Sequence, residues 1–159
     1  MSKWIAGLAA ILALAIAIPT FAGADGDRSC SLKLTARLAA VKTNSGSPPV
    51  NGSSTAGGTV DGTVCGKTFH GAARAVNRFM FGKFRHNTLT FGPLGSFRAK
   101  GRGSGTQNSG NGSATLSGHG KITGGTGIYD NASGSIHFKG TVAGGSQVAT
   151  LHITGRIDY

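Results

Sequence analysis

The chain has 159 residues, of which 28 are glycine and 16 are lysine or arginine, and its formal net charge is +11. All five acidic residues are aspartates scattered along the sequence, so the chain lacks the closely spaced carboxylates typical of many acid–base enzymes. It contains no GxSxG, HExxH or Walker-type pattern, and so nothing in it supports a serine hydrolase, a zinc protease or a P-loop enzyme.

The first 24 residues predict a secretory signal peptide. Lys3 precedes an apolar run from Trp4 to Ile18, and Ala22-Gly23-Ala24 forms a small-x-small cleavage site. The run is shorter than the roughly 20 residues that span a bilayer as a helix. We expect an exported, extracellular protein in which residues 25–159 form one domain, with no stable membrane span after cleavage. The alternative is an uncleaved N-terminal anchor.

The mature chain contains two cysteines, Cys30 and Cys65. In an exported protein an even cysteine count is typical of disulfide pairing. We therefore predict a Cys30–Cys65 disulfide. Their spacing matches neither a CxxC redox motif nor a zinc cluster.

Alternating apolar and polar residues over most of the mature chain predict an all-β protein. Residues 43–58 contain two prolines and many Gly, Ser and Thr, and we expect them to form a flexible loop. The tally is seven or eight strands, which suits a barrel or a sandwich. The predicted strand regions are residues 31–41, 59–65, 66–92 as two strands broken near Gly82, 97–106, 113–123 and the C-terminal hairpin.

The C-terminal hairpin is the clearest local prediction. Gly144-Gly145 separates two alternating segments, and two-residue Gly-Gly loops favour hairpin turns. This turn would place Phe138 opposite Leu151 on an apolar inner face. It would also place His137 opposite His152 on the outer face. Such a histidine pair could bind a transition metal or simply be exposed, and we assign no metal site.

The GGTGxYxxAxG pattern at residues 124–134 resembles a motif of the β-barrel superfamily of allene oxide cyclases and dirigent proteins. The resemblance implies an eight-stranded antiparallel barrel with one apolar lumen, in which the motif glycines permit positive φ or close strand approach. It also implies dimers or trimers. Allene oxide cyclases use a pocket glutamate, and this chain contains none, so their activity is not carried over.

Basic and aromatic residues interleave over residues 74–86. In a strand this alternation would point the aromatics inward and the cations into solvent. The candidate anion-binding residues are Arg74, Arg78, Lys83 and Arg85. Arg98, Lys100 and Arg102 form a second basic alternation. Anionic cell-surface polymers suit such a charge, whereas an exported protein is not expected to meet nucleic acid.

Three functions follow from these observations. The first is a non-catalytic module that binds a small apolar ligand in the barrel, with Asp61 and Tyr129 as polar residues of the lumen. The second is an isomerase or cyclase that uses Tyr129, Asp61 or histidines. The third is a basic surface protein that binds anionic cell-envelope polymers. No catalytic residue and no cofactor is assigned. A cavity lined by apolar residues would favour the ligand-binding module, and a cavity with convergent ionisable groups would favour the enzyme. A packed interior under a cationic wall would favour the basic surface protein.

Overall fold

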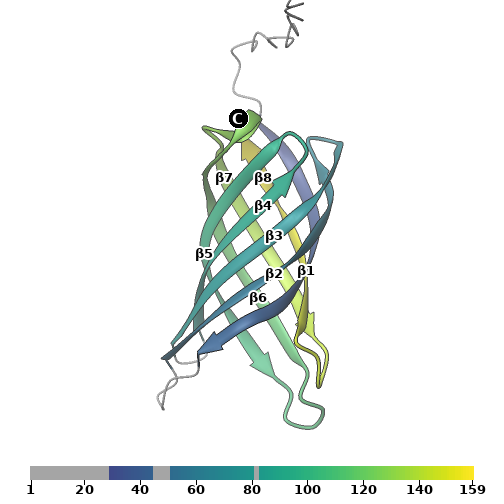
Figure 1. Cartoon of the computed structure of the whole chain (residues 1–159), viewed down its shortest axis with the longest axis vertical. Coiled ribbons are helices and arrows are strands. Elements are labelled where there is room, and N and C mark those ends of the chain that lie inside the picture. Colours follow the sequence, from purple (N-terminus) through teal and green to yellow (C-terminus); the bar gives the residue numbers. More distant parts are fainter. Residues whose placement is uncertain (1–28, 45–50, 81–82) are drawn as a thin grey trace, which may run out of the picture.

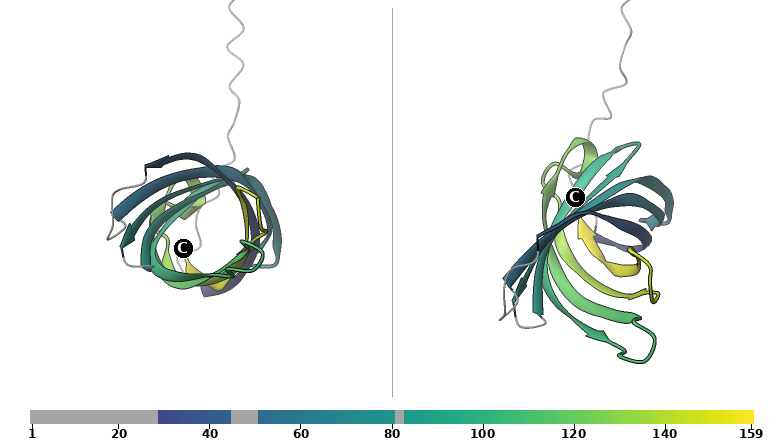
Figure 2. Two further views of the ribbon diagram at one scale, coloured as in Figure 1. Left: turned by 90° about the horizontal axis from the view of Figure 1, so that it is seen from below. Right: turned by 60° about the horizontal axis from the view of Figure 1, so that its bottom comes forward.

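Eight antiparallel strands close into a barrel in the computed structural model (Figure 1), which describes residues 29–44, 51–80 and 83–159. Each strand pairs with the next, and β8 pairs with β1 to complete the ring (Figure 2). The predicted eight-stranded antiparallel barrel is therefore confirmed. The predicted signal peptide lies outside the described residues. The strands are β1 (Ser29–Asn44), β2 (Asn51–Val64), β3 (Lys67–Met80), β4 (Lys83–Gly92), β5 (Gly95–Gln107), β6 (Ala114–Gly125), β7 (Ser133–Val142) and β8 (Val148–Asp158).

Alternation along the strands separates an apolar interior from a polar outer wall. In β1, Leu32 and Leu34 are buried while Lys33 is exposed. Ile153 and Ile157 of β8 are buried in the same way and join them in one core. Apolar burial of this kind contributes roughly 25 cal/mol per Å², which makes the inward set the main stabilising feature. Among the described residues, no helix is both long enough and apolar enough to cross a membrane.

The segment predicted as a flexible loop is largely strand. Asn51 to Gly58 belong to β2, and Thr43 and Asn44 end β1, whereas residues 45–50 lie outside the described residues. Glycine, serine and threonine show little contrast between the two faces of a strand, so this segment has no visible period. Backbone pairing with β1 on one side and β3 on the other makes it a strand despite that weak pattern.

The β7–β8 hairpin forms as predicted, but its register differs by two residues. Phe138 lies opposite Ile153, not Leu151, and the connection is a longer loop from Ala143 to Gln147. Within this loop the Ser146 backbone N–H donates to the Ala143 carbonyl at 3.0 Å. Because the shift is even, the inward and outward faces of both strands stay as predicted.

The register shift also separates the two histidines that we predicted to pair. His152 lies opposite Lys139, and His137 lies opposite Thr154 on that side. The predicted His137–His152 pair is therefore wrong. On its other side His137 faces His119 of β6, at 6.4 Å between ring centroids.

One end of the barrel, which we call the capped end, is covered by the β6–β7 connection. There the 3₁₀ turn η1 (Gly127–Tyr129) lies beside the β4–β5 turn (top of Figure 1). The Thr126 N–H donates to the Ser96 carbonyl at 2.8 Å, and the hydroxyls of Thr126 and Ser96 are 2.8 Å apart. Gly127 has a φ of +61°, and a Cβ at Gly125 would lie 2.1 Å from the Ser96 oxygen. The motif glycines therefore permit the positive φ and the close approach that the sequence predicted.

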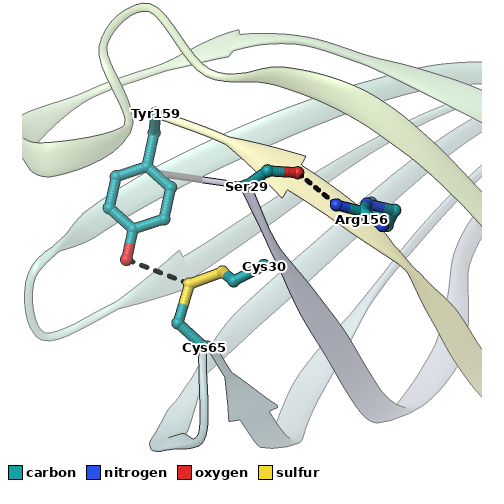
Figure 3. Close-up of a disulfide and its surroundings, with 5 residues drawn as sticks. All are labelled: Ser29, Cys30, Cys65, Arg156 and Tyr159. Atoms are coloured by element: carbon teal, nitrogen blue, oxygen red, sulfur yellow. Dashed lines mark hydrogen bonds between the residues drawn. A yellow bond between two sulfur atoms is a disulfide. The ribbon is translucent and has the colours of Figure 1, made fainter. Parts of the chain in front are cut away.

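The predicted disulfide is present at the capped end. Cys30 in β1 bonds to Cys65 in the β2–β3 turn, with their Cα atoms 5.1 Å apart. The Tyr159 hydroxyl donates to the Cys65 Sγ at 3.2 Å, and Arg156 donates to the Ser29 hydroxyl beside it (Figure 3). On the chain-entropy model, a crosslink of this loop length stabilises a domain by about 4 kcal/mol. The crosslink and the C-terminal residue thus hold the capped end together.

Candidate functional site

The interior at the capped end is filled by four aromatic rings, which we call the aromatic cluster: Phe69, Phe97, Tyr129 and Tyr159. Tyr129 lies at its centre, with ring centroids 5.8 Å from Phe97, 6.3 Å from Phe69 and 5.0 Å from Tyr159. Edge-to-face contacts of this kind add to the stabilisation from burial. The cluster therefore closes this end of the barrel and contributes to its stability.

Beside the aromatic cluster lies a cavity of about 30 Å³, bounded in part by Val64, Leu94 and Ile128. That volume holds one or two water molecules, whereas pockets for drug-sized ligands begin at about 300 Å³. The cavity at the capped end is therefore too small for the apolar ligand that the sequence suggested. Farther along the barrel, the inner wall includes residues whose side chains lie outside the described part of the chain.

The two residues predicted to be polar groups of the lumen lie in different places. Tyr129 is only 3% exposed, within the aromatic cluster. Its burial, and secondarily the nearby Tyr159, raise its pKa above the usual value of 10.0. Asp61, in contrast, is exposed on the outer face of β2, where it pairs with His70 of β3. The expectation that Asp61 points into the lumen is wrong, because the pleat of β2 directs Val60 inward instead.

On the outer wall, neighbouring strands bring basic side chains into one transverse line, which we call the basic row: Arg78, Arg85, Arg102, His119 and His137. Arg78 lies opposite Arg85, and Arg85 lies opposite Arg102. Arg102 then faces His119, to whose Nε2 its Nε–H donates at 3.4 Å. All five side chains are exposed. Adjacent strands lie about 4.8 Å apart, so the backbones of the three arginines occur within about 10 Å of one another.

The side chains of the basic row have no acidic partner in the described part of the chain. The ion pair found there joins Asp61 to His70, away from the row. The other described acids are Asp130, which follows η1, and Asp158, which ends β8. Like charges directly opposite each other destabilise a sheet. Folding stability alone therefore does not explain this arrangement.

The four residues predicted to bind anions are not equally placed. Arg78 and Arg85 are cross-strand neighbours, whereas Arg74 is exposed four residues away along β3, opposite Leu89. The backbone of Lys83 lies in β4 opposite Ser104, and its side chain lies outside the described residues. The structure thus brings together two of the four and adds Arg102 from the second basic alternation.

Sequence reasoning did not connect His119 and His137 to the arginines. The signal was present in the strong turn at residues 108–112, which fixes how β5 and β6 pair. In that turn the Gly112 N–H donates to the Asn108 carbonyl at 2.9 Å, and Arg102 consequently meets His119. Counting residues outward from this turn would have predicted that Arg102 lies opposite His119, which connects the arginines of the row to its histidines.

A metal centre has no support in the region that the structure describes, where no three His, Cys or Asp side chains lie close enough to share an ion. The His119–His137 pair is held beside a guanidinium that already contacts Nε2 of His119. Its surroundings are therefore cationic, which suits an anionic ligand better than a metal ion.

Comparison of the chain with protein-family models, with curated proteins and with solved structures finds no match. Membership of the allene oxide cyclase and dirigent superfamily stays a prediction from the motif. An exposed line of arginines and histidines that has no acidic partner among the described residues can bind extended anions.

Proposed function

We propose that this protein is a non-catalytic binding module whose outer wall binds extended anionic polymers through the basic row. The observation that carries the proposal is the cross-strand alignment of Arg78, Arg85 and Arg102. Guanidinium groups form bidentate hydrogen bonds with carboxylate, sulfate or phosphate oxygens, so adjacent arginines can bind successive anions of one chain.

Electrostatics over the rest of the wall support this function. Lys100 faces Lys121 in the next transverse line toward the capped end, so the positive potential extends beyond the basic row. None of the described acids lies in β4, β5, β6 or β7. A surface with one sign of charge attracts oppositely charged polymers and accelerates their association. An exported protein would meet such polymers in the cell envelope.

The binding of a small apolar ligand, and catalysis in the lumen, are less well supported. The cavity at the capped end is small, and the side chain of Asp61 is exposed on the outer face of the barrel. The described interior consists of apolar side chains with few polar groups such as Thr90, and no acid or histidine is buried among them. A ligand-binding or catalytic lumen would need converging polar groups to orient its ligand.

The test is binding of inorganic polyphosphate, measured by isothermal titration calorimetry at several salt concentrations. The row variant carries Arg78→Gln, Arg85→Gln and Arg102→Gln. The control variant, with Lys33→Gln, Arg37→Gln and Lys67→Gln, loses the same charge at exposed positions outside the row. We expect the row variant to flatten the slope of log K against log salt by about 2, since each lost phosphate contact contributes about 0.7 for a flexible strand.

The control variant should keep most of the wild-type slope. An equal loss of slope in both variants would mean that only net charge matters, and the basic row would then have no special role. Binding that does not weaken with salt would contradict a charge-driven contact altogether.

A further inference from the structure

A groove of about 380 Å³ crosses the outer surface of β5 to β8 next to the basic row, on the side away from the capped end. Most of its lining side chains bear hydroxyls, and Lys139 and His152 supply basic groups. The lining residues are Ser104, Thr106, Thr115, Leu116, Ser117, Lys139, Gly140, Thr141 and His152.

Strand register arranges these groups as transverse lines. Ser104 lies opposite Ser117, Ser117 opposite Lys139, and Lys139 opposite His152. Two residues farther along, the next line consists of threonines: Thr106, Thr115, Thr141 and Thr150. Neighbours are about 4.8 Å apart across strands and about 6.7 Å apart along them. A lattice of hydroxyls thus adjoins the basic row on one continuous wall.

The serine and threonine hydroxyls that line the groove form no intramolecular hydrogen bonds among the described residues. Among the described residues, the hydroxyls of Ser104, Ser117 and Thr141 form no hydrogen bond with another side chain or with the backbone, and the same holds for Thr106 and Thr115. Each hydroxyl can both donate and accept. They are therefore free to bind a ligand that presents many polar groups.

The same wall lacks what nucleic-acid binding usually needs. The outward positions of β5 to β8, all of them described, carry Arg, Lys, His, Ser and Thr, together with Val148 and Asp158 near the two ends of β8, and none carries Phe, Tyr or Trp. Phe97 and Phe138 point inward. Single-stranded nucleic acids bind largely through stacking of bases on exposed aromatic rings. A pure phosphate chain, in turn, would use the cations but would leave the hydroxyl lattice without a function.

We infer that the polymer bound by this wall is an acidic polysaccharide, a chain that carries carboxylate or sulfate groups and sugar hydroxyls together. This inference rests on the proposed function and names its ligand class. The acidic groups pair with the basic row and with Lys139, and the sugar hydroxyls exchange hydrogen bonds with the serines and threonines of the groove. The line from Ser104 to His152 spans about 14 Å, which accommodates a short oligosaccharide.

The test uses an oligogalacturonate, a polyphosphate and an oligothymidylate of matched charge as probes, with affinities measured by calorimetry. The groove variant carries Thr115→Ala, Ser117→Ala and Thr141→Ala, which leaves the charge of the protein unchanged. We expect it to bind oligogalacturonate roughly tenfold more weakly than wild type, because hydrogen bonds are lost. Its affinity for polyphosphate should stay unchanged.

The matched control is Thr59→Ala, Thr63→Ala and Thr68→Ala, which removes three exposed hydroxyls on β2 and β3. It should bind all probes as wild type does. Unchanged oligogalacturonate binding by the groove variant would overturn the polysaccharide assignment, and so would tighter wild-type binding of the oligothymidylate. In either of these outcomes, a basic-row variant that still binds polyphosphate more weakly than wild type would support the proposed anion-binding function.

Discussion

The capped end and the outer wall of β3 to β7 follow opposite physical rules. At the capped end, buried apolar side chains, a disulfide and the backbone hydrogen bonds of η1 stabilise the fold. On the outer wall, Arg78, Arg85 and Arg102 are opposed to one another without acidic partners among the described residues. The comparison separates residues that maintain the fold from residues that work against it, and the second group is where binding is expected.

Truncation inside the aromatic cluster should have the largest effect. Phe69→Ala removes a ring that is 3% exposed and contacts Phe97 and Tyr129. We expect the free energy of unfolding to fall by about 4 kcal/mol, since a large buried side chain is replaced by a cavity. Urea denaturation followed by circular dichroism measures this. A loss below about 1 kcal/mol would show that the capped end is not the stability centre.

Tyr129→Phe tests the same cluster through pH. The folded protein keeps Tyr129 protonated at a pH where the unfolded chain ionises, because its pKa is raised by burial and by Tyr159. This contribution is intact below pH 10 and is lost as the pH rises above it, by at most about 1.4 kcal/mol per pH unit. The wild type should therefore lose stability more steeply than the Phe variant between pH 10 and 11, measured by denaturant titration. Parallel curves would contradict the raised pKa.

A single change in the basic row should have the smallest effect on stability and the opposite sign. Arg85→Gln removes a charge that faces arginines on both sides, so we expect a gain of about 0.5 kcal/mol in the free energy of unfolding. Polyphosphate affinity should fall in the same protein. Lys33→Gln is the control, since Lys33 faces threonines on both neighbouring strands. A destabilised Arg85→Gln variant would give the row a structural role instead.

The fold was predictable where polarity alternates strongly and less so where it does not. Leu32 and Leu34 of β1 show their inward face in the sequence, as do Ile136 and Phe138 of β7. Asn51 to Gly58 were misread as loop because small polar residues fit either face of a strand. The hairpin register was misjudged by two residues, because the double glycine lies within a longer loop than a two-residue turn.

The candidate site was predictable only in part. Arg78 and Arg85 lie close together in sequence, near the end of β3 and the start of β4, so both could be singled out from the interleaved segment. Their alignment with Arg102 and His119 depends on two further pairings. Serine and threonine are common throughout this chain. The residues that line the groove therefore have no distinctive spacing in the sequence, and only the pairing of the strands identifies them.

By itself, the sequence determined the all-β class, the Cys30–Cys65 crosslink, the inward apolar set and the strong positive charge, because each depends on composition or on a period of two. The pairing of the strands was needed to show that Asp61 faces solvent, that η1 caps one end, and that basic side chains from five strands form one line. The physical reason is that strand register is set jointly by loop lengths and by barrel closure. A register shift of two residues, such as the one at β7–β8, changes every cross-strand neighbour but leaves the inward and outward faces of each strand intact.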